Sequence, residues 1–430
     1  MNKQSFIKKG LLSLILFLFA IKSILATELY DFLKTIPDIK EIKEIKASIG
    51  FKEAYEIMFW QPLDHNKPDG EHFLQRVYIS HRDFSKPVVF ETEGYAADKN
   101  YIHELSKILE ANQIRVEHRF FGKSVPDSMQ YKWTYLTIFQ AANDDHQILE
   151  TFKKIYKSKW VCTGISKGGQ TAVYFRSLFP DDVNVTVGYV CPIAFSPEDP
   201  RAYDFFKTVG TKECRDKVLN FQKMVLHYRD KIFPMFRETV TNKGYKFRIS
   251  LEAAFEYTVL EYAFSFWQWS DECDLIPDKN ASIQDIFTHL EQISSFDYFA
   301  ESDMETFFYQ ALTELGYYNY DITPLKGLIK YIDKPTYSFM APANVTITYN
   351  PKPLQEVNEF IQTKGNNILY LYGELDPWSS CSANISNKTN AVKIVKKGGN
   401  HSTRIMNLPY DQKELAYKTL EKWLDITIER

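Results

Sequence analysis

The 430-residue sequence lacks several features that mark whole classes of protein. Its net charge is only −3, with charges of both signs scattered along the chain, which argues against a nucleic-acid partner or an anionic membrane surface. No apolar run reaches the roughly 20 residues that span a bilayer, so stable membrane insertion is not expected. Internal repeats and low-complexity segments are missing too. What remains is a folded protein, 44% hydrophobic and long enough for roughly two structural units.

Cysteine is also scarce, with five residues in the whole chain. No pair has the C-x-x-C spacing of a zinc cluster or redox motif, and the odd number leaves at least one thiol unpaired. Cys162 and Cys191 lie in apolar segments, where a free cysteine behaves as a small core residue. Cys214 and Cys273 lie in polar segments, and we predict that they are bonded to each other, with Cys381 unpaired.

The first 26 residues have the pattern of an export signal. Three lysines precede an apolar run over residues 11–21, and Ala26 offers a small residue for cleavage. A run of about eleven residues is too short for a stable membrane anchor. The sequence therefore predicts an exported protein, periplasmic or extracellular, whose mature chain begins near Thr27, and export permits disulfides.

The most informative segment has the pattern strand, sharp turn, helix. An apolar run at residues 160–162 leads to the turn, and a helical pattern follows at 171–178. Gly164, Ser166 and Gly168 form the motif G-x-S-x-G, in which small residues let the backbone bend sharply and expose a serine hydroxyl. The motif also occurs by chance in glycine-rich turns, but a strand before it and a helix after it are typical of a nucleophile elbow.

A nucleophile at a helix N-terminus is well placed for acyl transfer. The backbone N–H of Lys167 can face the oxyanion that develops on the attacked carbonyl. In this type of fold a second donor comes from the loop after an early strand, and Gly94 and Tyr95 follow the apolar segment 86–92. Gly94 is equally consistent with an ordinary turn.

Strand and helix patterns alternate on both sides of this segment, which predicts a parallel sheet covered on both faces. Residues 28–46 instead suggest a short surface helix or arm. Residues 197–341 are helical and rich in aromatic side chains, which indicates a helical cap inserted into the sheet domain. The predicted units are therefore a first core part at 27–196, the cap at 197–341 and a second core part at 342–430.

A serine hydroxyl needs a histidine base oriented by an acid, and in this fold the order along the chain is serine, acid, histidine. Asp376 and His401 follow the last two predicted strands, on the sheet edge where Ser166 emerges. Glu374 is an alternative acid, although Pro377 rigidifies the turn after Asp376. The other histidines after the serine, His227 and His289, fall in the predicted cap, where an ordinary role is favoured.

No metal or cofactor site is indicated. His118 and the group Asp144, Asp145 and His146 match no zinc or calcium spacing, so we interpret them as structural. Arg119 is expected to pair with a carboxylate.

Several longer segments together resemble the PS-ten family of secreted serine tripeptidyl aminopeptidases. They are TEGY (92–95), VEHRFFGKSVP (116–126), WTYLTIFQAANDDH (133–146), TGISKGGQTAVYFRSLFPDDV (163–183), GELDPW (373–378) and GNHSTRI (399–405). The chain is more distantly similar to lysosomal prolyl carboxypeptidase and its dipeptidyl-peptidase relative. The resemblance implies an α/β-hydrolase fold with a large, mainly helical cap between the nucleophile elbow and the last core strands. It also implies a capped cleft and the triad Ser166, Asp376 and His401.

The function that follows is a serine exopeptidase, without a cofactor, that releases short peptides from free N-termini. Such an enzyme needs a carboxylate for the substrate ammonium, and the candidates are Glu93 and Glu261, each also consistent with a structural ion pair. The alternatives are a prolyl-type dipeptidyl peptidase or carboxypeptidase, an esterase with the same triad, and an inactive hydrolase fold used for binding. The charged residues Glu91, Glu93 and Lys167 suit a peptide better than an acyl chain.

Overall fold

The computed structural model describes residues 27–127, 133–270, 272–302 and 304–430. The predicted export signal, residues 1–26, lies outside the described residues. Within those ranges, no helix is both long and apolar enough to cross a membrane.

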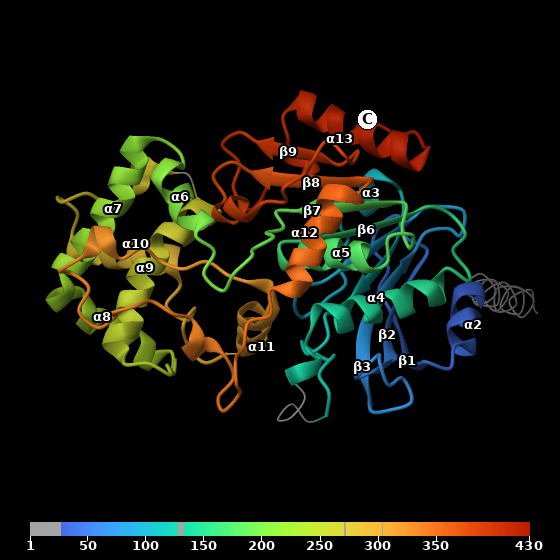
Figure 1. The fold of residues 1–430 in the computed structure, drawn as a ribbon, viewed down its shortest axis with the longest axis horizontal. Coiled ribbons are helices and arrows are strands. Elements are labelled where there is room, and N and C mark those ends of the chain that lie inside the picture. The colour runs from blue at the N-terminus through green and yellow to red at the C-terminus, as the bar shows by residue number, and fades with distance from the viewer. Residues whose placement is uncertain (1–26, 128–132, 271, 303) are drawn as a thin grey trace, which may run out of the picture.

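The centre of the molecule is a nine-stranded sheet in the order β1-β2-β3-β5-β4-β6-β7-β8-β9 (Figure 1). From β1 to β5 neighbouring strands in this order are antiparallel, and from β5 to β9 they are parallel. The strands are β1 (Ile39–Ile45), β2 (Glu53–Pro62), β3 (His72–His81), β4 (Val88–Thr92), β5 (Asn112–Val116), β6 (Trp160–Ile165), β7 (Val185–Tyr189), β8 (Ile368–Gly373) and β9 (Val392–Lys396).

Helices cover both faces of this sheet because its central strands carry apolar side chains on both sides. In β4, Val88 and Phe90 share one core cluster with α4 and α5, while Val89 between them joins the opposite cluster with α3 and α13. The covering helices are α2 (Thr27–Thr35), α3 (Glu104–Ile108), α4 (Ile138–Phe152), α5 (Lys167–Leu178), α12 (Lys352–Thr363) and α13 (Tyr410–Leu424). This mostly parallel sheet between two helical layers is the α/β-hydrolase fold.

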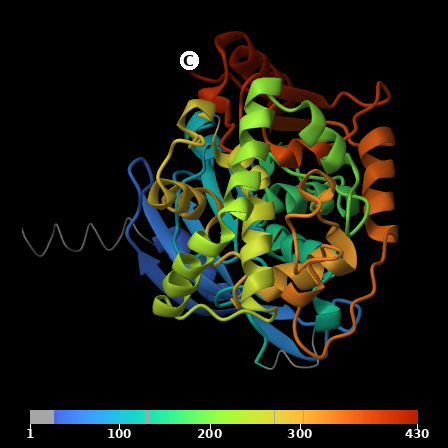
Figure 2. The ribbon, with the colours of Figure 1, turned by 90° about the vertical axis from the view of Figure 1, so that its left-hand side faces the viewer.

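A second, helical body lies between β7 and β8 in the sequence, and we call residues 197–341 the cap. It is built on an aromatic core that also includes Phe121 and Leu375 from the sheet domain. Figures 1 and 2 show the cap beside the sheet rather than on either helical layer. Its helices are α6 (Arg201–Thr208), α7 (Lys212–His227), α8 (Arg229–Asn242), α9 (Leu251–Trp269), α10 (Ile283–Ser294) and α11 (Met304–Gln310), followed by a π-helical turn, η3 (Ala311–Leu315). Short 3-10 turns in the described chain are η1 (Trp133–Tyr135), η2 (Cys273–Leu275), η4 (Thr323–Leu325), η5 (Ser338–Met340), η6 (Pro377–Cys381) and η7 (Ile405–Asn407).

The N-terminal segment differs from its prediction. Residues 28–46 form not only the helix α2 but also the edge strand β1. The sequence of β1, IKEIKEI, has an apolar residue at every third position, which imitates a helix and hides the period of two that a strand normally shows. Its pairing with β2 is irregular between Ile39 and Glu41, as is common at a sheet edge.

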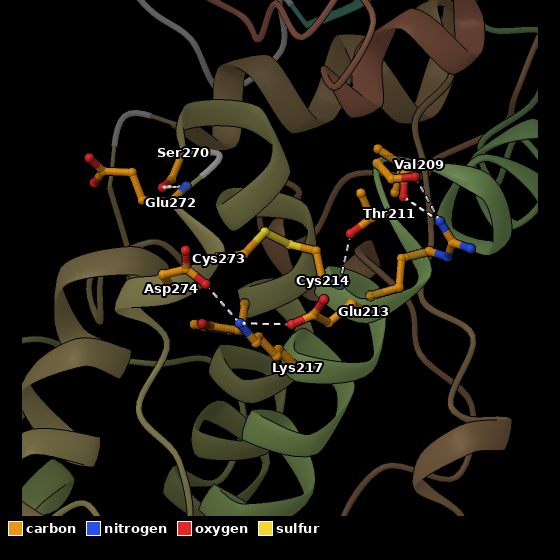
Figure 3. Close-up of a disulfide and its surroundings, with 12 residues drawn as sticks. Val209, Thr211, Glu213, Cys214, Lys217, Ser270, Glu272, Cys273 and Asp274 are labelled. Carbon is orange, nitrogen blue, oxygen red and sulfur yellow. Dashed lines mark hydrogen bonds and ion pairs between the residues drawn. A yellow bond between two sulfur atoms is a disulfide. The ribbon is translucent and has the colours of Figure 1, made fainter.

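A disulfide within the cap joins Cys214 in the first turn of α7 to Cys273 in η2, with the two Cα atoms 5.5 Å apart (Figure 3). Beside it, the Lys217 ammonium lies 2.9 Å from Asp274 and 3.4 Å from Glu213. The remaining cysteines, Cys162, Cys191 and Cys381, are free and buried.

Removal of this disulfide should destabilise the cap. The bond closes a loop between residues 59 positions apart, for which loop-closure entropy predicts a contribution of about 4 kcal/mol. We expect the Cys214→Ser/Cys273→Ser variant to lose about that much free energy of unfolding in urea titrations. A reductant should weaken the native protein to the same extent and leave the double variant unchanged. An unchanged unfolding midpoint in the double variant would contradict this prediction.

Candidate active site

The candidate site residues lie at one edge of the sheet. Strands β4, β6, β8 and β9 are parallel, so their carboxyl ends meet at the same edge, where ligands bind in open α/β sheets. The four loops that leave these strands carry Gly94, Ser166, Asp376 and His401. In Figure 1 the strands β8 and β9 end on the side of the cap.

Ser166 occupies the sharp turn between β6 and α5. Its φ of 55° and ψ of −121° are strained for a residue with a side chain, and its N–H donates to the carbonyl of Tyr189 at 2.8 Å. The turn needs glycine on both sides. A Cβ on Gly164 would overlap the backbone of Gly168, and a Cβ on Gly168 would lie 2.6 Å from the carbonyl oxygen of Thr92. These contacts explain the spacing G-x-S-x-G physically.

The loop after β4 packs directly on the first turn of α5. A Cβ on Gly94 would lie 2.6 Å from the Cβ of Lys167, so only glycine fits there. The buried Lys167 ammonium donates to the Gly94 carbonyl at 2.6 Å, and burial holds the pKa of this lysine well below its usual value. The sequence-predicted oxyanion residues Lys167, Gly94 and Tyr95 are thus brought together.

The two loop N–H groups differ in how they are used. The N–H of Gly94 lies beside the carboxylate of Glu93 and stabilises its charged form. The N–H of Tyr95 has no acceptor among the described residues, and Tyr95 is held through its carbonyl, which accepts from the N–H of His118 at 3.3 Å. Tyr95 is therefore the better candidate for the second oxyanion donor.

His401 and Asp376 form a buried pair. The Nδ1–H of His401 donates to Oδ2 of Asp376 at 2.7 Å, which leaves Nε2 free to accept a proton. The other carboxylate oxygen of Asp376 accepts the N–H of Trp378 at 3.1 Å. Glu374, the alternative acid, is exposed and accepts the N–H of Gly398 at 2.8 Å instead. Of these two carboxylates, Asp376 is the one that bonds to His401.

Ser166 is half-buried, and its hydroxyl has no hydrogen-bond partner among the described residues. The structure therefore places serine, acid and histidine at one sheet edge, with only the acid and histidine bonded. Without substrate, the bond between nucleophile and base is often long and tightens in the substrate complex.

Glu93, the first candidate for the substrate ammonium, is already paired. Arg115 donates from Nε to its carboxylate at 2.8 Å and contacts the same oxygen with Nη2. Arg115 also lies 3.6 Å from the buried Glu91. Burial raises the pKa of Glu91 to about 8, helped by the negative charge of Glu93 and opposed by Arg115. This cluster fixes the base of the Gly94 loop.

Glu261, the second candidate, is buried in the cap without a cationic partner among the described residues. Its carboxylate accepts hydroxyl hydrogen bonds from Tyr318 at 2.7 Å, Tyr320 at 2.5 Å and Ser265 at 2.8 Å. Burial raises the pKa of Glu261 to about 7, and the hydroxyls oppose the rise.

An aromatic cluster connects Glu261 to the candidate triad. Tyr318 stacks on Phe264 with ring centroids 3.6 Å apart, and both rings contact Trp378, at 5.3 and 5.1 Å. Trp378 is the residue whose N–H binds Asp376. Sequence reasoning missed the two tyrosines that hold Glu261, although the unusual run GYYNY at residues 316–320 was a visible signal.

Three of the residues that we interpreted as structural, Arg119, Asp144 and His146, form ion pairs. Arg119 forms two 2.7 Å bonds to Asp144, which also lies 2.7 Å from Nε2 of His65. His146 pairs with Asp182 at 2.6 Å. In the described part of the chain, no group of three or more His, Cys, Asp or Glu side chains could hold a metal ion.

Comparison with known proteins identifies the family. The family model described as PS-10 peptidase S37 matches residues 23–429. This chain belongs to that family.

Individual known proteins are also similar to this chain over all or part of its length. The prolyl tri/tetrapeptidyl aminopeptidase of Streptomyces mobaraensis is 33% identical over 414 residues, which cover 93% of this chain and 85% of that protein. The prolyl carboxy peptidase like protein 5 of Caenorhabditis elegans is 30% identical over 152 residues, 30% of this chain and 29% of that one. Among solved structures, proline iminopeptidase of Mycobacterium smegmatis aligns at a TM-score of 0.40 and 12% identity, over 86% of this chain and 99% of that one. As a member of the PS-10 peptidase S37 family, the chain is a serine peptidase.

Gly94→Ala should damage this peptidase more than it damages the fold. The added Cβ meets Lys167 and the N–H of Gly168, so the loop must move away from the first turn of α5. Displacing one oxyanion donor costs about 100-fold or more in kcat. Steady-state kinetics on a peptide anilide, with the melting temperature measured in parallel, test this.

Gly244→Ala is the control. The φ of 71° at Gly244 is unfavourable for an alanine, but the added Cβ would meet open space in the cap. It should lose some stability and keep its kcat. Equal kcat values for the two alanine variants would contradict the role of the Gly94 loop.

Proposed function

We propose that this PS-10 family member is an exported serine exopeptidase that releases tripeptides from free N-termini. Ser166 is the nucleophile, His401 the base and Asp376 the residue that orients the base. The observation that carries the proposal is the buried His401–Asp376 pair on the sheet edge where the strained Ser166 turn emerges. The name of the Streptomyces mobaraensis relative supports the substrate class.

The chemistry follows from the positions of the proton carriers. Ser166 attacks the scissile carbonyl as its proton passes to Nε2 of His401, and Asp376 stabilises the imidazolium through Nδ1–H. The backbone N–H groups of Lys167 and Tyr95 donate to the oxyanion. His401 then protonates the departing amine, and a water molecule, deprotonated by His401, releases the peptide from the acyl-enzyme.

Glu261 receives the substrate ammonium. Its carboxylate has three hydroxyl donors and no Lys or Arg partner among the described residues, whereas Glu93 is neutralised by Arg115. A buried carboxylate without a cation is costly, so an arriving ammonium gains a strong partner there. The ring contact between Tyr318, which binds Glu261, and Trp378, whose N–H binds Asp376, supports this assignment.

The geometry of α9 supports the release of three residues. Glu261 and Trp269 lie on this helix eight positions apart, which corresponds to about 12 Å along its axis. The ring of Trp269 contacts the ring of His401. An extended peptide covers about 10 Å in three residues and about 7 Å in two. The distance from the ammonium site to the level of the histidine therefore fits a tripeptide better than a dipeptide.

Ser166→Ala and His401→Ala should each abolish turnover without unfolding the protein. Nucleophile and base act as one unit, so either change should lower kcat by roughly 10⁴-fold or more. Hydrolysis of a tripeptide anilide by purified protein measures this. His227→Ala, which removes an exposed histidine of the cap, is the control and should retain full activity. Near-native activity of Ser166→Ala would refute the assignment.

The native enzyme should prefer a free N-terminus, and the preference should titrate with Glu261. The measurement is the ratio of kcat/KM for a free tripeptide anilide to that for its acetylated form, which cancels the ionisation of His401. Acetylation removes the buried ion pair between the substrate ammonium and Glu261, which predicts a ratio of about 100 or more. Because the pKa of Glu261 is raised to about 7, its carboxylate is charged above that pH, so the ratio should fall as pH drops through 7.

Two glutamine variants separate the candidate carboxylates. Glu261→Gln should bring the ratio close to one, whereas Glu93→Gln, which disturbs the Gly94 loop, should lower kcat for both substrates and preserve their ratio. Equal hydrolysis of free and acetylated substrates by the native protein would instead support an endopeptidase. Efficient cleavage of simple esters but not of peptides would support an esterase.

A further inference from the structure

The loop that carries His401 is held by the cap as well as by the core. The backbone N–H of His401 donates to the carbonyl of Gln268 at 3.0 Å, and Nδ2 of Asn400 donates to the carbonyl of Trp269 at 3.2 Å. Gln268 and Trp269 are the last two residues of α9. The final carbonyls of a helix have no partner within the helix, so this end of α9 offers acceptors that the His401 loop uses.

The side chain of Trp269 adds a third contact. Its ring lies nearly perpendicular to the ring of His401, with the centroids 5.2 Å apart. Trp269 is 60% exposed, so it contributes little to the core of the cap, unlike its buried neighbour Trp267. Perpendicular aromatic contacts of this kind are energetically favourable and directional.

The end of α9 is itself anchored on both sides of Trp269. Before it, Trp267 packs so closely on Gly210 that a Cβ there would overlap the indole ring. After it, Cys273 is bonded to Cys214 at the start of α7 (Figure 3). The three contacts to the His401 loop therefore come from a fixed part of the cap.

We propose that the last turn of α9 positions His401, with Trp269 as the positioning residue, so that the triad is in working order only while the cap contacts the core here. The inference rests on the proposed function, since it assigns a role in the same triad. Asp376 fixes His401 through Nδ1, and α9 fixes it through the backbone and the ring face. The helix that offers Glu261 to the substrate ammonium thus also supports the base.

The test uses two readouts on the full-length protein. One is the rate at which a fluorophosphonate probe labels Ser166 over a range of pH, which needs the nucleophile and base but no peptide. The other is kcat and KM for the free tripeptide anilide. A misplaced base should lower the labelling rate and kcat and leave KM unchanged, and it should shift the acid limb of the pH profile.

Trp269→Ala should lower both the labelling rate and kcat by about tenfold, with KM within about twofold of the native value. Trp269→Phe keeps an aromatic ring and should recover most of the loss. Leu275→Ala removes another exposed apolar side chain of the cap, 65% exposed, and should behave as the native protein does.

Native labelling and an unshifted pH profile in Trp269→Ala would overturn the inference, as would an equal loss in Leu275→Ala. If Trp269→Ala does not fold, Asn400→Ser tests the same junction from the core side, because it removes the amide donor to the Trp269 carbonyl. Native kinetics in that variant would also overturn the inference. A native protein that is not labelled at Ser166 refutes the proposed function itself and the inference with it.

Discussion

The close approach of the loop after β4 to the first turn of α5 is the contact on which the site depends. Gly94, Gly164 and Gly168 lie where a Cβ would collide with neighbouring backbone or with Lys167. The hydroxyl of Thr92 donates to the carbonyl of Gly168 at 2.9 Å and ties the same two segments together. The distance between the nucleophile and the candidate oxyanion donors is therefore set by backbone packing, which a flexible side chain cannot provide.

Glu261 stands out among the buried glutamates of the described chain. Glu117 lies 3.1 Å from Arg76, and Glu256 lies 2.5 Å from Arg229. Glu314 has no such cation in the described part of the chain, and burial raises the pKa of its carboxyl to about 7. It nevertheless accepts the N–H of Ile138 at the start of α4, where the helix dipole favours negative charge. Among the described residues Glu261 has only hydroxyl partners, and its proposed role toward the substrate ammonium rests on this difference.

Much of the fold could be predicted from the sequence because most core strands are apolar runs between clear turn residues. The elbow, the α4 helix and the strands before Asp376 and His401 all have such local signals. The predicted pairing of Arg119 with a carboxylate is confirmed in the bidentate contact with Asp144. Strand β1 was missed because its apolar residues recur every third position, and α3 because five residues are too few for a periodic signal.

The candidate site was harder to predict where it depends on contacts between distant segments. No local pattern shows that Arg115 neutralises Glu93 or that tyrosines 57 and 59 positions away bind Glu261. The junction between Gln268 and His401 likewise joins the cap to the last core loop. Such contacts follow from the way the cap and sheet meet, which sequence spacing alone does not describe.

The position of the cap in the chain also has a consequence for biosynthesis. Ser166 is synthesised before the cap, while Asp376, His401 and the strands β8 and β9 come after it. Under the proposed function, a growing chain therefore carries its nucleophile before its acid and base have been synthesised. Such a chain becomes competent for hydrolysis only after the last strands, β8 and β9, have joined the sheet.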